Sequence, residues 1–287
     1  MSAGREVIFV GGTRFSGAEV VAGLLADHPA AAGVPVAARF HSDPWGIPAL
    51  LHGRIGLGDF TARLRCGEVA ERVAGDRLDR ALDALRERYH AKPLEACREL
   101  LWALFGDLAG DSARALVEAS PGNLVEAQTL MRLVPEARFV HVARDGRDVA
   151  AAAVGSDVNV SRIPAGMEWW AAELREIEHG VRGEEDGSPY AIPPDRLAVI
   201  VLDELVAAGA GAAYAQLCNR VGLGDDGAVP APIPLDAAAI GRGRWRSQRR
   251  GLARWWITGR YERILGELED EGNHAAPLLR AAFERMG

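Results

Sequence analysis

The amino-acid sequence predicts one α/β domain with a central parallel sheet, and three observations support that fold class. Short apolar runs at residues 7–10, 138–143 and 196–202 have the composition of strands covered on both faces. The first two runs each end in a turn and continue into a helical pattern, as parallel α/β units do. Hydrophobic residues form 48% and charged residues 25% of the 287 residues, which excludes a disordered or fibrous protein.

The N-terminal half starts with a strand, a glycine turn and a helix. Residues 7–10 read VIFV and predict the strand, Gly11 and Gly12 form the turn, and residues 18–25 predict the helix. Residues 54–110 are rich in Ala, Leu, Arg and Glu at helical spacing. We therefore expect a helical cap inserted beside the sheet.

The remaining elements continue the alternation of strand and helix. We expect strands at 115–118, 138–143 and 196–202, and helices at 125–134, 149–154, 167–182, 212–221 and 253–271. No internal repeat or long linker divides this pattern, so residues 1–287 are predicted to form a single domain. Such sheets bind ligands at the carboxyl ends of their strands, so the turns that follow the strands are the candidate sites.

Composition excludes several other classes of protein. The formal net charge of -7 argues against a general nucleic-acid binder, and no run reaches the ~18 apolar residues that a membrane span needs. The N-terminus lacks the pattern of a signal peptide, so we expect a cytoplasmic protein. Cys66, Cys97 and Cys218 are widely spaced and form no CxxC or Cys/His cluster, which predicts buried thiols and no disulfide or zinc site.

A single lysine stands among the 33 Lys and Arg residues, and this limits the chemistry of any anion site. Lys92 lies in the segment AKPLEACREL, far from any glycine-rich turn. A phosphate loop of the kinase or ATPase type needs a lysine ammonium beside the phosphates. Arginines must therefore carry the anion binding in this chain.

Three turns contain glycines or arginines that suit an anion. Residues 11–17 (GGTRFSG) join a strand to a helix, where backbone N–H groups can cradle a phosphate. Residues 144–148 (RDGRD) place two guanidiniums at the end of another strand, and residues 242–246 (RGRWR) could clamp a nucleotide by charge and stacking. Each also has a purely structural interpretation: a tight turn, an Arg/Asp pair that closes the turn, and a solvated basic loop.

In their order along the chain, these segments resemble the cytosolic-type sulfotransferases of bacteria. The match runs from strand-GGTxxSG-helix through ExSP, RFVHVARDGRDVAAA and LDELV to GRWR, and covers nearly the whole chain. Its most specific part is residues 138–151, because the family typically reads RFIHLVRDPRDVAVS at this place. The resemblance implies a three-layer, P-loop-like fold that binds 3'-phosphoadenosine 5'-phosphosulfate (PAPS). It also implies transfer of the sulfuryl group to a hydroxyl or amine of a small molecule, with 3',5'-adenosine bisphosphate (PAP) as product and no obligatory metal.

The resemblance also assigns roles to individual residues. The residues that it places on the 5'-phosphosulfate are Gly12, Thr13, Arg14, Phe15, Ser16, Gly17, Ala18 and Glu19. Those that it places on the 3'-phosphate are Arg144 and Ala152, and the loop that closes over the nucleotide contains Arg242, Gly243 and Arg244. Glu118 stands where some relatives have a catalytic glutamate and is the candidate general base. Arg14 is the cation of the first turn and the second candidate catalytic residue.

A second hypothesis is a protein of this fold that has lost PAPS chemistry and catalyses another reaction or acts as a binding protein. Five residues favour it because they replace the family's basic residue, hydroxyls or lysine: Phe15, Ala18, Glu19, Ala119 and Ala152. A nucleotide kinase is a third possibility, disfavoured by the missing lysine. The segments expected to select the acceptor, 39–60 and 156–167, carry no recognisable pattern, and the oligomeric state cannot be read from the sequence.

Overall fold

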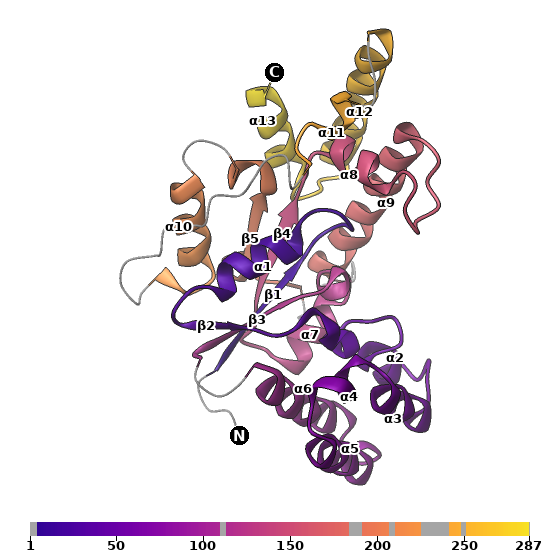
Figure 1. Ribbon diagram of the computed structural model, residues 1–287, viewed down its shortest axis with the longest axis vertical. Helices are drawn as coiled ribbons and strands as arrows, with labels where there is room; N and C mark the ends of the chain where they lie inside the picture. The colour runs from indigo at the N-terminus through magenta and orange to yellow at the C-terminus, as the bar shows by residue number, and fades with distance from the viewer. Residues whose placement is uncertain are drawn as a thin grey trace.

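Five parallel strands form the central sheet, in the order β2-β3-β1-β4-β5 (Figure 1). The computed structural model describes residues 5–109, 113–183, 191–206, 210–224, 241–247 and 251–286. The strands are β1 (Glu6–Gly11), β2 (Ala31–Gly33), β3 (Ala115–Ala119), β4 (Arg138–Ala143) and β5 (Leu197–Val201). The expected parallel α/β architecture is confirmed, and the three-residue edge strand β2 is an addition to it.

Helices cover both faces of this sheet. The helices that precede β4 are α1 (Ala18–Ala26), α2 (Ile47–Leu51), α3 (Leu57–Cys66), α4 (Glu68–Arg72), α5 (Gly75–Tyr89), α6 (Pro93–Ala109) and α7 (Ala127–Leu133). Those that follow β4 are α8 (Gly146–Ala153), α9 (Ile163–Arg182), α10 (Ala210–Arg220), α11 (Arg244–Ser247), α12 (Leu252–Asp270) and α13 (Ala276–Met286). The sequence analysis did not anticipate α13, and the segment 230–234, between α10 and α11, lies outside the described residues.

The alternation of side chains along β1 separates the two faces of the sheet. Val7 and Phe9 belong to the apolar cluster formed with the helices α2–α7, whereas Ile8 and Val10 belong to the cluster formed with α1 and α10. All four side chains are fully buried. The molecule therefore has three layers, with the sheet in the middle, and a third cluster joins α8 and α9 to the C-terminal helices.

The helical segment between β2 and β3 packs directly on the sheet. Phe105 of α6 lies 6.4 Å from Phe9 of β1 between ring centroids, and both belong to the same apolar cluster. In Figure 1 the helices α2–α6 lie together beside one end of the sheet. The helices α2–α6 and the sheet therefore share one apolar core.

The sequence predicts that all three cysteines are buried. Cys97 and Cys218 are buried free thiols, but Cys66 at the end of α3 is exposed, so the prediction of three buried thiols was wrong for this residue. The reason is its position at the solvent face of a helix whose opposite face carries Phe60 and Leu64.

Within the described ranges, no helix has both the length and the apolar character that crossing a bilayer requires.

Candidate functional site

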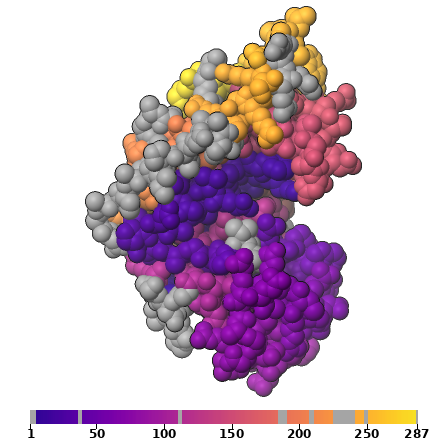
Figure 2. Space-filling model, viewed as in Figure 1, coloured from indigo at the N-terminus to yellow at the C-terminus, as the bar shows by residue number. Residues whose placement is uncertain are grey.

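A cavity of about 950 Å³ opens at the carboxyl ends of the strands. Its wall contains residues that directly follow four strands: Gly12 after β1, Ser120 after β3, Arg144 after β4 and Leu202 after β5. Figure 2 shows this side of the molecule hollowed between the segment around α9 and the helices that follow β2. Parallel sheets bind ligands at this edge, so the cavity is the candidate functional site.

Two glycines of the first turn lie where any side chain would clash with neighbouring atoms. A Cβ at Gly12 would lie 2.4 Å from the carbonyl oxygen of Val142 and 2.6 Å from Oγ of Ser16. Gly17 has a φ of 87°, in the left-handed region, and directly precedes helix α1. The Ser16 hydroxyl is buried and has no hydrogen-bond partner among the described residues. A buried hydroxyl without a partner at a helix N-terminus suits a bound anion.

Two carboxylates from other parts of the chain contact this turn. The backbone N–H of Arg14 donates to Oε2 of Glu173 on α9 at 2.9 Å. The Arg14 guanidinium donates to both carboxylate oxygens of Asp157 at 2.7 Å each. Burial raises the pKa of Glu173, whereas the hydrogen bond from Arg14 lowers the pKa of Asp157. The backbone N–H and Nη2 of Arg14 thus already donate to protein carboxylates.

Arg144 connects the second turn to the first. This residue follows β4, is buried, and donates through Nη1 to the carbonyl oxygen of Phe15 at 2.8 Å. The Phe15 ring packs against Trp169 of α9, with the ring centroids 6.2 Å apart. Ala152 of α8 also lines the cavity. All ten residues that the resemblance assigned to the two phosphates, from Gly12–Glu19 with Arg144 and Ala152, therefore lie around one cavity.

The second arginine of the RDGRD turn faces away from the cavity. Arg147 forms an ion pair with Asp145, at 2.6 Å from Nη2 to Oδ2, and is almost fully buried. Its guanidinium lies over the rings of Trp245, Tyr261 and Phe283, at 4.5, 4.7 and 4.8 Å from the centroids. The structural interpretation, an Arg/Asp pair that closes the turn, is correct for Arg147. The sequence could not separate the two arginines because their environments are set by the C-terminal helices.

Two buried carboxylates hold the segment 241–247, one in the RDGRD turn and one after β5. Asp148 accepts hydrogen bonds from the backbone N–H groups of Gly243 and Trp245, at 2.7 and 3.2 Å. Arg242 pairs with Asp203 at the end of β5, at 3.2 Å. Burial raises the pKa values of both Asp148 and Asp203. The predicted closing loop, Arg242–Arg244, is therefore placed beside Arg144, although its residues do not line the cavity themselves.

Glu118 lies behind the cavity wall in a network of buried polar groups. Its side chain has no exposed surface. Nε2 of His41 lies 2.8 Å from Oε2, which also accepts from Nδ2 of Asn123 at 2.7 Å, while Oε1 accepts from Oγ of Ser120 at 2.6 Å. Only Ser120 of these residues lines the cavity. The carboxylate of Glu118 consequently reaches the cavity through the Ser120 hydroxyl and not directly.

Sequence reasoning missed four residues of this site: His41, Asn123, Asp157 and Glu173. His41 stands 77 residues before Glu118, and Glu173 stands 159 residues after Arg14. Neither belongs to a motif, so only the tertiary structure brings them to the site. The sequence around His41, VPVAARFHSD, carries no signal that separates this residue from a structural one.

Within the described part of the chain, no group of three or more His, Cys, Asp or Glu side chains is arranged to hold a metal ion. The cavity wall contains a glycine turn at the N-terminus of α1, the Ser16 hydroxyl without a hydrogen-bond partner among the described residues, and Arg144. Together with the parallel sheet, these features define an α/β protein with an anion-binding loop at its strand ends.

Comparison with known proteins identifies the family. A model described as Sulfotransferase family matches residues 7–226, and the chain belongs to this family. Among solved structures, the sulfotransferase domain of an olefin synthase from Synechococcus superimposes with a TM-score of 0.50 at 15% identity. That match covers 91% of this chain and 94% of the domain, and it supports the P-loop-like fold.

Two other solved structures also match this chain. The sulfotransferase domain of the curacin biosynthetic pathway has a TM-score of 0.48 at 15% identity, covering 93% of this chain and 97% of that domain. A sulfotransferase from Alicyclobacillus acidocaldarius has a TM-score of 0.47 at 15% identity, covering 93% and 95%. A search of curated protein sequences finds no significant match.

Proposed function

We propose that the protein is a sulfotransferase that takes its sulfuryl group from PAPS and transfers it to a hydroxyl or amine of a small molecule, as in specialised metabolism. The observation that supports this function is that two separate turns line one cavity and a third segment is held beside them. The glycine turn supplies backbone N–H groups, Arg144 supplies a guanidinium, and the segment 241–247 is anchored beside it. A doubly phosphorylated adenosine needs two anion sites of this kind.

The proposed roles follow the geometry. Gly12–Glu19 would hold the 5'-phosphosulfate, with Ser16 as a hydroxyl donor and Arg14 as the nearby cation, and Arg144 with Ala152 would face the 3'-phosphate. PAPS supplies the reactive sulfuryl group when it is bound. The chain's contribution is then to position donor and acceptor and to stabilise charge on the oxygen that leaves sulfur. Both contributions come from hydrogen-bond donors that the fold holds in place.

The proton of the acceptor would leave through the Glu118 network. Ser120 is the member of this network on the cavity wall, and its hydroxyl donates to Glu118 at 2.6 Å. We infer that an acceptor hydroxyl passes its proton to the Ser120 oxygen while Ser120 passes its own proton to the carboxylate of Glu118. His41 and Asn123 fix the other oxygen of that carboxylate.

We expect Glu118→Gln to lower both turnover and stability. The carboxylate accepts from three partners, and an amide that replaces one oxygen by NH₂ leaves a buried donor facing another donor. The expected loss in the free energy of unfolding is about 1–3 kcal/mol. Urea titration measures it, and calorimetry should show PAP affinity nearly unchanged because Glu118 does not line the cavity.

The matched control for this variant is Glu136→Gln, a change of the same kind at an exposed position before β4. It should leave the urea midpoint unaltered. If Glu118→Gln folds as stably as the unaltered protein and turns over at the same rate, the carboxylate has neither the structural nor the proton-accepting role.

The decisive test of the proposed donor is titration of PAP into the protein by calorimetry. A PAPS-dependent enzyme should bind its product nucleotide with a dissociation constant in the micromolar range or below. Circular dichroism on the same sample establishes that the protein is folded. A folded protein that releases no heat with PAP would remove PAPS from the proposal.

A second function is favoured by the contacts of Arg14. Because Glu173 and Asp157 already occupy its donors, the turn as it stands offers fewer free groups to a phosphosulfate. A protein of this family that has lost PAPS chemistry, and acts on or binds another ligand, would retain this arrangement. The PAP titration separates the two functions.

A further inference from the structure

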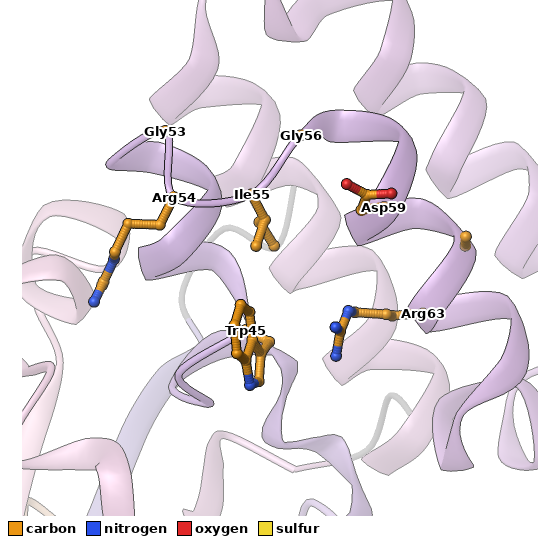
Figure 3. Close-up of a pocket in the computed structure, with 8 residues that line it drawn as sticks. Trp45, Gly53, Arg54, Ile55, Gly56, Asp59 and Arg63 are labelled. Carbon is orange, nitrogen blue, oxygen red and sulfur yellow. The ribbon is translucent and has the colours of Figure 1, made fainter.

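The main cavity continues into two further recesses along the helical cap. A recess of about 730 Å³ shares Arg39 and Asp43 with the main cavity, and a pocket of about 520 Å³ shares Trp45 and Arg63 with that recess. These three hollows therefore adjoin one another through shared residues, from the glycine turn to α3, and the row that they form is called the path below. The distal pocket is built by Trp45, the loop between α2 and α3, and one face of α3 (Figure 3).

Trp45 and Arg63 form the wall of the distal pocket. The Trp45 side chain is 53% exposed, and Cζ of Arg63 lies 5.0 Å from the centroid of its indole ring. Figure 3 shows the guanidinium directed from α3 toward the indole, with Ile55 above the ring. The exposed indole of Trp45, at the end of the path, offers a stacking surface to a planar ligand.

Arg63 contacts the indole of Trp45 but has no acidic partner among the described residues. Asp59 stands one helical turn earlier and also faces the pocket, yet within the described ranges Arg63 forms no ion pair. Elsewhere on the surface such pairs do form, as in Arg80 with Asp76. Because its guanidinium lies over the indole and forms no such ion pair, its N–H groups are available to a carboxylate, which a guanidinium binds through two parallel hydrogen bonds.

Arg54 of the distal pocket pairs with Glu126 at 3.8 Å, but the recess contains two more arginines that have no ion pair with a described residue. They are Arg39, which the recess shares with the main cavity, and Arg72 at the end of α4. The acidic residues of the recess are Asp43 and Glu68, and Asp43 accepts a hydrogen bond from the backbone N–H of Trp45 at 3.2 Å. Arginines that have no ion pair with a described residue thus line both recesses, which favours an anionic ligand.

We propose that this path is the acceptor subsite and that its acceptor carries a planar aromatic ring with a carboxylate at the end remote from the reacting hydroxyl. The ring would stack on Trp45, and the carboxylate would bind the in-plane donors of Arg63. Because it names the acceptor class, the proposal rests on the proposed sulfotransferase function.

The test compares two probes that share a ring system and differ by a carboxylate, 6-hydroxy-2-naphthoate and 2-naphthol. Calorimetry with the full chain should give roughly tenfold tighter binding of the naphthoate. Arg63→Gln should abolish that preference, and Trp45→Ala should weaken both probes. The matched control is Arg65→Gln, because Arg65 lies on the same helix and pairs with Asp79 outside the pocket.

Three results would overturn the subsite: equal binding of the two probes, a preference that survives Arg63→Gln, or loss of naphthoate binding in Asp59→Asn. Removing a negative charge should favour a bound carboxylate, so the last result would show that the naphthoate carboxylate does not bind beside Asp59 and Arg63. Naphthoate preference in a protein that does not bind PAP would support the subsite and reject the donor. PAP binding without the preference would reject the subsite alone.

Discussion

Replacing Arg144 with alanine is expected to weaken PAP binding by roughly 30- to 100-fold, the equivalent of about 2–3 kcal/mol. The guanidinium is buried at the cavity wall and also holds the carbonyl oxygen of Phe15, so its removal takes away a charge-assisted donor and loosens the first turn. Calorimetric titration of PAP into both proteins measures the change. The effect should be large because a buried donor cannot be replaced by solvent.

Arg220→Ala provides the control for this variant. Arg220 is an exposed arginine at the end of α10, away from the cavity, and its removal changes the formal charge by the same amount. A general effect of net charge would weaken PAP binding equally in both variants. Unaltered PAP affinity in Arg144→Ala would contradict the assignment of this turn to a phosphate.

Replacing Glu173 with glutamine is expected to strengthen PAP binding by roughly five- to tenfold. The carboxylate lies on the backbone N–H of Arg14, where it repels an incoming phosphate, whereas the amide oxygen can accept the same hydrogen bond without a charge. The pKa of Glu173 is raised by burial. The affinity of the unaltered protein should therefore increase as the pH falls toward that pKa, and Glu173→Gln should lose this component of the pH dependence.

Glu168→Gln is the matched control for the Glu173 variant. Glu168 lies on the same helix but pairs with Arg260, outside the cavity. It should leave both the affinity for PAP and its pH dependence unaltered. If Glu173→Gln binds PAP no more tightly than the unaltered protein, the carboxylate does not oppose the anion, and the hypothesis of lost PAPS chemistry loses its main support.

Local patterns predicted most of the sheet and its helices. The strand expected at 138–143 coincides with β4, and the turn and helix that follow it are α8 and its N-terminus. Such units are legible because a strand buried on both faces must be apolar and a turn at its end must be polar or glycine-rich. The edge strand β2 has three residues, Ala31–Gly33, and no distinguishing composition, so its pairing with β3 could not be read.

The sequence by itself determined the parallel α/β architecture, the family and the turns that carry the proposed anion-binding groups, because each depends on residues close together along the chain. The tertiary structure decided which of these groups face the cavity. It buried Arg147 under the aromatic rings of the C-terminal helices, placed Glu118 behind Ser120, and brought Glu173 and Asp157 onto the glycine turn. Those outcomes depend on contacts between residues far apart in sequence, and packing alone selects among them.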